Sequence, residues 1–341
     1  MTAYFIRRFL LIVPTFVGIT IMVFAITRFV PGGPVERMIS TARQMQTEGG
    51  KGLSVGVGRE TSGQPLSEEQ IEQLKEYYGF DKPVVTSYFL WLVKVLQGDL
   101  GSSTRYYDPV WDMIKERIPI SLYFGLLTMV IVYGVCIPLG IAKAVRHRTG
   151  FDNFTSIVIF VGYAIPGWVA GVILLVIFSS QMDIFPLGGF TSDIFNDLSL
   201  MEKVRDIAWH TALPLIAYII GSFSVMTLLM KNTLMDQLSA DYVRTAIAKG
   251  LSFKQAVFRH ALQNSLIPIA TSFGNNISIV LTGSFLIEKV FNINGMGLLG
   301  YESVVDRDYP VVMVILVISS LLFMVGNILS DICVALVDPR V

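Results

Sequence analysis

Charged residues are scarce in this 341-residue chain, at 15% of the sequence, whereas soluble domains carry about 25%. Apolar residues make up 53% of the chain, and the mean hydropathy is +0.61. This composition is typical of an integral membrane protein. The formal net charge is zero, which argues against the chain-wide basic field expected of a nucleic-acid-binding protein.

Groups that bind metals or perform covalent catalysis are also few. The two cysteines, Cys136 and Cys333, lie inside long apolar runs, which argues against a disulfide framework and a zinc site. The three histidines, His147, His210 and His260, are far apart in the sequence. The sequence contains no H-E-x-x-H, G-x-S-x-G or Walker A motif. It therefore predicts neither an enzyme nor a cofactor or metal site, and any ATP that drives the protein must bind to another chain.

Six long apolar runs dominate the sequence. A helix that crosses the roughly 30 Å hydrocarbon layer needs about 20 mostly apolar residues. The runs are continuous rather than alternating, which favours helices over a barrel. We therefore predict an all-α membrane protein with six transmembrane helices. These helices are expected at Phe9–Val30, Ile118–Ala142, Phe154–Ser180, Thr211–Met230, Asn264–Ile287 and Tyr309–Ser330.

The distribution of basic residues predicts the orientation of these helices. Short loops rich in Lys and Arg stay on the cytoplasmic side. The segment before the first run, with the second-to-third and fourth-to-fifth connections, carries ten Lys and Arg, whereas the two short opposite connections carry four. The sequence therefore predicts a multi-pass inner-membrane protein with both termini in the cytoplasm.

The long connection between the first two runs then lies in the periplasm and contains helical patterns. Ser67 and Gln70 form a capping box, and the apolar residues of Tyr88–Gln97 share one side of a helix. Residues 108–117 begin with an Asp-Pro pair, which suits the start of a short helix. Two compatible interpretations stay open: a folded cap over the membrane domain, and a contact with an external partner.

The connection between the fourth and fifth runs contains two short helical patterns. Gly250 is placed to end the first, since glycine accepts the left-handed conformation found after helices. Ser252 and Gln255 form a capping box at the start of the second. This second helix is either a basic amphipathic helix on the inner leaflet or a docking element for a partner. Its apolar stripe consists of Phe253, Val257, Phe258, Ala261 and Leu262.

This same connection resembles a known family. The string YVRTAIAKGL at 242–251, followed by RHALQN at 259–264 and Pro268, is similar to the coupling loop of ABC importer permeases. More narrowly, it is similar to the dipeptide/oligopeptide subfamily. Alignment on Gly250 places Arg244 where the wider superfamily has Glu, and Gln263 where it has Pro. In both departures the sequence resembles the peptide subfamily.

The resemblance extends along nearly the whole chain. Within the family, GYAIP at 162–166 and LGYE at 299–302 are most similar to the subgroup of broad-specificity oligopeptide importers that also take up microcin C. The other strings that carry the resemblance are Arg7-Arg8, PGGPV at 31–35, YGFDKP at 78–83, GDLGSS at 98–103, VFNINGMG at 290–297, RDYPV at 307–311 and DPR at 338–340.

The resemblance implies a type I ABC importer permease fold with a long helical periplasmic loop after the first helix. It divides the chain into an N-terminal end with the first helix (1–30), a periplasmic cap (31–117) and a five-helix core (118–341) with the coupling loop at 231–263. Its implied partners are a second permease chain, ATP-binding subunits that hold ATP and Mg, and a periplasmic peptide-binding protein. Its implied substrates are oligopeptides and peptide antibiotics such as microcin C. The ATPase-coupling residues it implies are Ala246, Gly250, Leu251, Phe253, Val257 and Arg259.

Polar and small residues inside the runs suggest further roles. Pro166 is predicted to kink the third helix, and Gly167 and Gly171 after it form G-x-x-x-G, which permits close helix packing. That glycine face packs either within the chain or against a second permease. Polar residues in the fifth run are costly against lipid, so we expect them to face the pore or a neighbouring helix. These residues are Asn275, Asn276, Ser278 and Thr282.

The main alternative is a proton-coupled secondary transporter of small solutes. Such carriers usually bury Asp, Glu or His near the middle of the membrane and often contain internal repeats. The predicted runs contain no acidic residue deep inside them, and Arg28 lies at a run's end. A membrane-embedded enzyme would need paired catalytic groups at membrane depth, and the sequence shows none. These observations favour the importer subunit.

Overall fold

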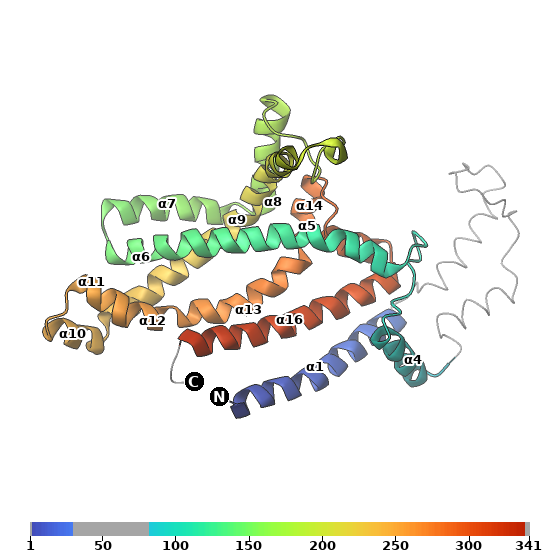
Figure 1. Ribbon diagram of the computed structural model, residues 1–341, viewed down its shortest axis with the longest axis horizontal. Helices are drawn as coiled ribbons and strands as arrows, with labels where there is room; N and C mark the ends of the chain where they lie inside the picture. The colour runs from blue at the N-terminus through green and yellow to red at the C-terminus, as the bar shows by residue number, and fades with distance from the viewer. Residues whose placement is uncertain (1, 30–81, 338–341) are drawn as a thin grey trace, which may run out of the picture. The chain divides into compact units, whose positions relative to one another are not determined.

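The computed structural model describes residues 2–29 and 82–337, and every regular element in these residues is a helix (Figure 1). The α-helices are α1 (Thr2–Phe29), α4 (Val84–Leu96), α5 (Val110–Ile131), α6 (Ile137–Val145), α7 (Gly150–Ala164), α8 (Gly167–Leu174), α9 (Leu200–Ser239), α10 (Asp241–Ala248), α11 (Phe253–Ala256), α12 (Leu262–Ser265), α13 (Ile267–Thr282), α14 (Phe285–Val290), α15 (Met296–Val305) and α16 (Tyr309–Val337). Three π-helical segments (Val132–Cys136, Leu175–Gln181, Val257–Ala261) and one 3-10 turn (Phe195–Asp197) connect some of them.

Four described helical segments are long and apolar enough to cross a membrane. They are Ile6–Ile26, Val110–Val145, Leu200–Ser239 and Tyr309–Val337, and they overlap the first, second, fourth and sixth predicted runs. A fifth candidate is the broken pair α7 and α8. The predicted fifth run, Asn264–Ile287, is divided among α12, α13 and α14, of which α13 has 16 residues. The described residues therefore define an all-helical protein with four to five membrane-capable helices.

The third predicted run is broken rather than kinked. Helix α7 ends at Ala164, Ile165 is extended, and Pro166 is the N-cap of α8, so that the two helices meet at 93°. Proline lacks the N–H that would continue the helix and disfavours the helical conformation at the preceding residue. The chain therefore turns sharply at this point.

The two glycines after this turn pack within the chain. A Cβ atom on Gly167 would lie 2.5 Å from the carbonyl oxygen of Ala217 on α9. One on Gly171 would lie 2.9 Å from the ring of Phe291. The glycine face therefore packs within the chain, which is the first of the two alternatives given above. These positions admit no larger side chain, because α9 and the segment after α14 approach them closely.

The described residues fall into two compact units. The larger consists of Met1–Phe9, Ile114–Tyr301 and Ser319–Val341, and α9 is its central helix, packed against α6, α7 and α8. One apolar cluster surrounds Met230 and Leu234 on α9 and includes Val257 and Ala261. A second cluster surrounds Phe124, Ala217 and Phe291. Because the long helix α9 contributes residues to both clusters, it connects one cluster to the other.

The smaller unit comprises Leu10–Met113 and Glu302–Ile318. Asp308 accepts hydrogen bonds from Ser103 Oγ at 2.5 Å and from the backbone N–H of Thr104 at 3.0 Å. On α1, the Thr20 hydroxyl lies 3.0 Å from the hydroxyl of Tyr88 on α4. Buried polar contacts of this kind fix the positions of the segments that they join.

Two expectations for the long connection change with the structure. The helix expected at Tyr88–Gln97 is α4 and already begins at Val84, directly after Pro83. The short helix expected at 108–117 is wrong, because α5 begins at Val110 and continues past Arg117 to Ile131. The predicted boundary between residues 117 and 118 therefore lies inside a helix. The capping box at Ser67 and Gln70 lies outside the described residues.

Candidate functional site

The connection after α9 folds as two short helices joined by a glycine turn. Helix α9 continues to Ser239, and Ala240 separates it from α10. Gly250 has φ +98°, and its N–H donates to Ile247 O at 2.9 Å. The N–H of Leu251 donates to Ala246 O at 3.3 Å. These two bonds form a Schellman motif, which ends α10 at the predicted glycine.

The second helix begins at the predicted capping box. The backbone N–H of Ser252 donates to Gln255 Oε1 at 3.0 Å, and the N–H of Gln255 donates to Ser252 Oγ at 3.3 Å. These reciprocal bonds satisfy two N–H groups that would otherwise be unpaired at the helix start. The structure confirms this local prediction.

The apolar stripe of this helix is divided between two faces. Val257 is only 1% exposed and packs with Ala261 into the cluster around α9, whereas Phe258 is 53% exposed. The segment Val257–Ala261 is π-helical, with more residues per turn than an α-helix. Residues five apart therefore come to share a face, and Phe253 is exposed together with Phe258.

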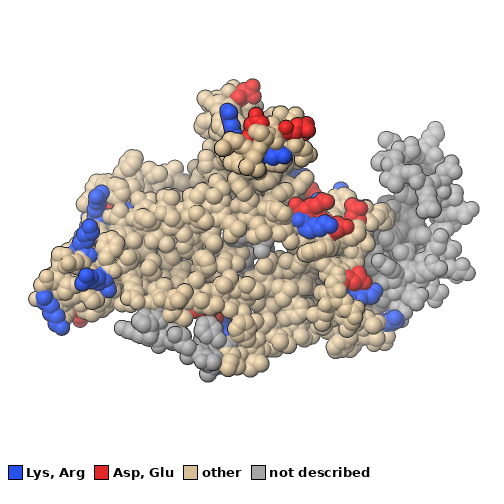
Figure 2. Space-filling view, in the orientation of Figure 1, with Lys and Arg blue, Asp and Glu red and all other residues tan. Residues whose placement is uncertain are grey.

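The six predicted coupling residues accordingly differ in exposure. Ala246 and Val257 are buried, so they support the loop from within and present no outer surface. Leu251 is half-buried. Gly250, Phe253 and Arg259 are exposed. The basic residues Lys249, Lys254, Arg244 and Arg259 are exposed as well, and Figure 2 shows Lys and Arg gathered where α10 and α11 lie in Figure 1.

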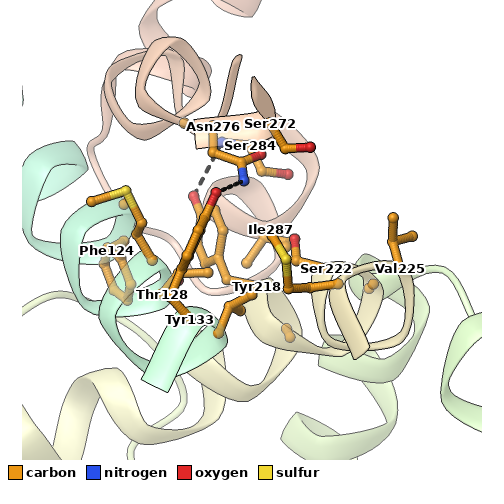
Figure 3. A pocket seen from close by; sticks show the side chains of 18 of the residues that line it. Phe124, Thr128, Tyr133, Tyr218, Ser222, Val225, Ser272, Asn276, Ser284 and Ile287 are labelled. Carbon is orange, nitrogen blue, oxygen red and sulfur yellow. Dashed lines mark hydrogen bonds between the residues drawn. The ribbon is translucent and has the colours of Figure 1, made fainter. Parts of the chain in front are cut away.

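A cavity of about 640 Å³ opens among α5, α8, α9, α13 and α14 (Figure 3). Its lining combines aromatic and aliphatic side chains with neutral hydrogen-bonding groups, and none of the described lining residues is charged. The neutral polar side chains in the lining are Ser121, Thr128, Tyr133, Tyr218, Ser222, Thr271, Ser272, Asn276 and Ser284.

Two hydrogen-bonded tyrosines lie in the cavity wall (Figure 3). Asn276 Nδ2 donates to the hydroxyl of Tyr133 at 2.9 Å. The backbone N–H of Ser284 donates to the hydroxyl of Tyr218 at 3.1 Å. Among the four residues expected to face the pore, Asn276 lines this cavity. The side chains of the other three (Asn275, Ser278 and Thr282) lie outside the described residues.

A buried carboxylate beside the cavity is not predicted by the sequence patterns. Glu288 on α14 is 1% exposed and accepts hydrogen bonds from Tyr218 OH at 3.2 Å and from the N–H groups of Ser284 and Leu298 at 3.2 and 2.6 Å. Gly283 and Gly295 leave room for its carboxylate, and these flanking glycines are the only sequence signal that we identify.

The described residues contain no group of three or more His, Cys, Asp or Glu side chains that could hold a metal ion. The buried carboxylates of Asp152 and Glu288 instead have Lys, Tyr and backbone N–H groups as partners. The hydrogen-bonding groups of the cavity are hydroxyls and amides rather than a nucleophile with its base. What this arrangement offers chemically is a neutral chamber and an exposed loop.

Apolar helices, a neutral cavity among them and a basic, partly apolar loop define a multi-pass membrane protein of the transport class. Residues 136–341 match the family described as binding-protein-dependent transport system inner membrane component. This range includes the loop and α8, α9, α13 and α14 of the cavity wall. The chain belongs to this family of inner-membrane transport components.

Relatives match along the full length of the chain. It is 40% identical over 359 residues to the inner membrane ABC transporter permease protein YejB of Escherichia coli O157:H7, with 100% of this chain and 99% of the relative covered. It is 39% identical to the peptidoglycan transport system permease protein YejB of Agrobacterium fabrum, covering 100% and 98%. It is 33% identical to the oligopeptide transport system permease protein AppB of Bacillus subtilis, covering 100% and 99%.

Proposed function

We propose that this chain is the membrane-spanning permease subunit of an ATP-driven importer of peptides. The observation that carries the proposal is the family match over residues 136–341, with full-length relatives named as ABC and oligopeptide permeases. ATP hydrolysis then resides on partner subunits that bind ATP and Mg. The exposed loop and the neutral cavity supply the two features that such a subunit needs, a docking surface and a path.

The proposed topology has six transmembrane helices and both termini in the cytoplasm. In this topology α13 crosses the membrane together with its neighbours α12 and α14, and α7 and α8 form one broken span. The basic end with α10 and α11 faces the cytoplasm, which agrees with the preference of Lys and Arg for that side. The periplasmic cap assigned to residues 31–117 then lies on the outer side of a bacterial inner membrane.

The loop from α10 to α12 is the proposed docking element for the ATPase subunit. Phe253 and Phe258 offer an exposed apolar pair that a groove can receive, and Arg259 lies beside them with its charge exposed. The turn at Gly250 fixes the angle between the two short helices. ATP-driven closure of the partner subunits would move this loop and, through α9, the wall of the cavity.

The cavity suits a substrate that is rich in amides and varied in its side chains. Hydroxyl and amide groups exchange hydrogen bonds with peptide groups, whereas a charged wall would retain substrates of opposite charge. A second, related permease chain closes the path from the other side, and a periplasmic binding protein delivers the peptide. Microcin C is a proposed substrate of this kind.

A proton-coupled carrier is the second candidate, and the observation that favours it is Glu288. This carboxylate is buried beside the cavity, as carboxylates in proton-coupled carriers often are. Glu288 also has a structural role, because it accepts hydrogen bonds from the N–H of Leu298 at the start of α15 and from the hydroxyl of Tyr218. The two candidates differ in whether uptake requires ATP.

Purification in mild detergent followed by reconstitution in liposomes separates these candidates. We expect mass spectrometry to find a second permease and ATP-binding subunits with the chain. Labelled tri- to pentapeptides should enter the liposomes only when ATP and the binding protein are present. Uptake by the chain alone, driven by a proton gradient without ATP, would contradict the proposal and establish the carrier.

A further inference from the structure

A lysine at the end of α6 is completely buried. Lys143 has 0% exposure, which is rare for a lysine. Its Nζ donates to Asp152 O at 2.9 Å, to Thr155 Oγ1 at 2.7 Å and to Ser156 Oγ at 2.9 Å, all near the start of α7. It also lies 3.1 Å from Asp152 Oδ1. Lys143 has its acceptors within the chain, so it ties α6 to α7 instead of awaiting a ligand.

The same aspartate is bound from a third helix. Lys231 Nζ on α9 donates to Asp152 Oδ1 and Oδ2 at 2.7 and 2.9 Å. The backbone N–H of Arg148 donates to Asp152 Oδ2 at 3.1 Å, and His147 Nδ1 lies 3.3 Å from that oxygen. The Asp152 side chain is only 4% exposed. One carboxylate therefore joins α6, α7 and α9.

The charges of this cluster point to positioning rather than to simple stability. A buried ion pair often contributes no more to stability than apolar residues of the same size, because both charges lose their hydration. The cluster nevertheless places two ammonium groups around one buried carboxylate, those of the fully buried Lys143 and of Lys231, whose side chain is 12% exposed. Such a costly arrangement is directional, and it fixes the relative position of the three helices.

The cluster lies where motion of the loop would enter the membrane helices. Lys231 is on the last part of α9, which leads through Ala240 directly into α10. Close by, a Cβ on Gly140 of α6 would lie 2.6 Å from Met230 Cβ, so α6 and α9 are in close contact. Helix α7 in turn leads through the 93° break into α8, where Trp168 lines the cavity.

We propose that Asp152 is a positioning residue that makes α6, α7 and the end of α9 move with α10 as one body. Through it, displacement of the loop by the ATPase reaches α7 and the cavity wall at α8. Toward the middle of the two helices, Ser224 Oγ on α9 also donates to Ile159 O on α7 at 2.8 Å, whereas the Lys231–Asp152 bonds tie α7 to the part of α9 that leads into α10. This inference rests on the proposed function, because it assigns a route for movement that the ATPase subunits would supply.

The first test uses Lys231→Met and Lys231→Arg in the reconstituted importer. Lys231→Met leaves Lys143 and Asp152 as a balanced pair and keeps the Ser224–Ile159 hydrogen bond, so the subunit should fold while the ionic link from α7 to the last part of α9 is lost. We expect ATP hydrolysis to persist and peptide uptake per ATP to fall about tenfold, within the usual range of coupling between sites. Lys231→Arg should restore the ratio. Arg205→Met, which replaces an exposed basic residue near the other end of α9, is the control.

A distance measurement separates coupled motion from a purely structural role, because a purely structural role would not change how the distance responds to nucleotide. Spin labels at the exposed positions Phe154 on α7 and Asp241 on α10 report whether the two helices move together. In the parent importer their separation should be the same with and without ATP, whereas in Lys231→Met it should change with nucleotide. If the parent protein fails to import with ATP, the proposed function falls. If the parent imports and Lys231→Met keeps both the uptake ratio and a constant distance, the inference is overturned.

Discussion

Two ends of the larger unit each bury one carboxylate, Asp152 at the end with α10 and α11 and Glu288 at the end with α14. The two carboxylates are held in different ways. Asp152 is held by ammonium groups from α6 and α9, and its partner Lys231 is 79 residues away in sequence. Glu288 is held mainly by nearby backbone, through the N–H groups of Ser284 and Leu298, with Tyr218 as its distant partner. The first carboxylate connects helices, whereas the second organises a turn.

This difference suggests different duties for the two ends. A tie between helices transmits displacement, because moving one helix pulls on the others. A carboxylate enclosed by its own turn and by the start of α15 keeps that turn rigid while neighbouring helices move. The end with α10 and α11 would therefore be the driven end, and the end with α14 would shape the cavity.

The largest expected effect is at the driven end, in the variant Gly250→Pro. Proline requires φ near −65°, whereas Gly250 has φ +98° and donates its N–H to Ile247. The turn between α10 and α11 would be lost, and peptide-stimulated ATP hydrolysis should fall to the unstimulated level while membrane insertion is kept. Gly250→Asn is the control, because Asn tolerates the left-handed conformation. Normal stimulation in Gly250→Pro would refute the role of this turn.

Next in size is the variant Asp152→Ala, which leaves the buried Lys143 and the half-buried Lys231 without their carboxylate. Removal of one partner from a buried ion pair typically costs about 3–5 kcal/mol of stability. The melting temperature of the purified complex should fall clearly, and the exposed Asp193→Asn should leave it unchanged. An unaltered melting temperature in Asp152→Ala would show that the tie between helices is weak.

The glycine turns of the two ends offer a matched pair. Gly283 and Gly250 both have positive φ, so alanine costs about 1–2 kcal/mol of conformational strain at either position. A Cβ at Gly283 would also collide with the Glu288 carboxylate, whereas a Cβ at Gly250 meets nothing within 4 Å. Gly283→Ala should therefore lower the melting temperature more than Gly250→Ala. Equal losses would mean that the Glu288 turn is not rigid.

Local signals in the sequence predicted local structure well. The turn at Gly250 and the capping box at Ser252 depend on residues within a few positions of one another, and both are found. Pro166 was expected to kink a helix and instead separates two, because Ile165 before it also leaves the helical conformation. The division of the apolar stripe depends on a π-helical turn that helical spacing does not predict.

Burial of the charged residues required the fold. Lys143 and Lys231 were counted among the basic residues that set the orientation, and such a count does not distinguish a surface lysine from a buried one. Their shared contact with Asp152 depends on how α6, α7 and α9 pack. Glu288 follows the predicted end of the fifth run, and only the path of the chain to α15 reveals that it is enclosed.

The most direct measurement is photo-crosslinking from the exposed loop in the intact importer. A photoreactive phenylalanine analogue in place of Phe253 or Phe258 should crosslink to a subunit that carries a Walker A motif, identified by mass spectrometry. The same analogue at Phe160, exposed on α7, should yield no such product. An ATP-binding subunit captured only from the loop is the predicted result. Absence of that subunit from both loop positions, or equal capture from Phe160, would contradict the account.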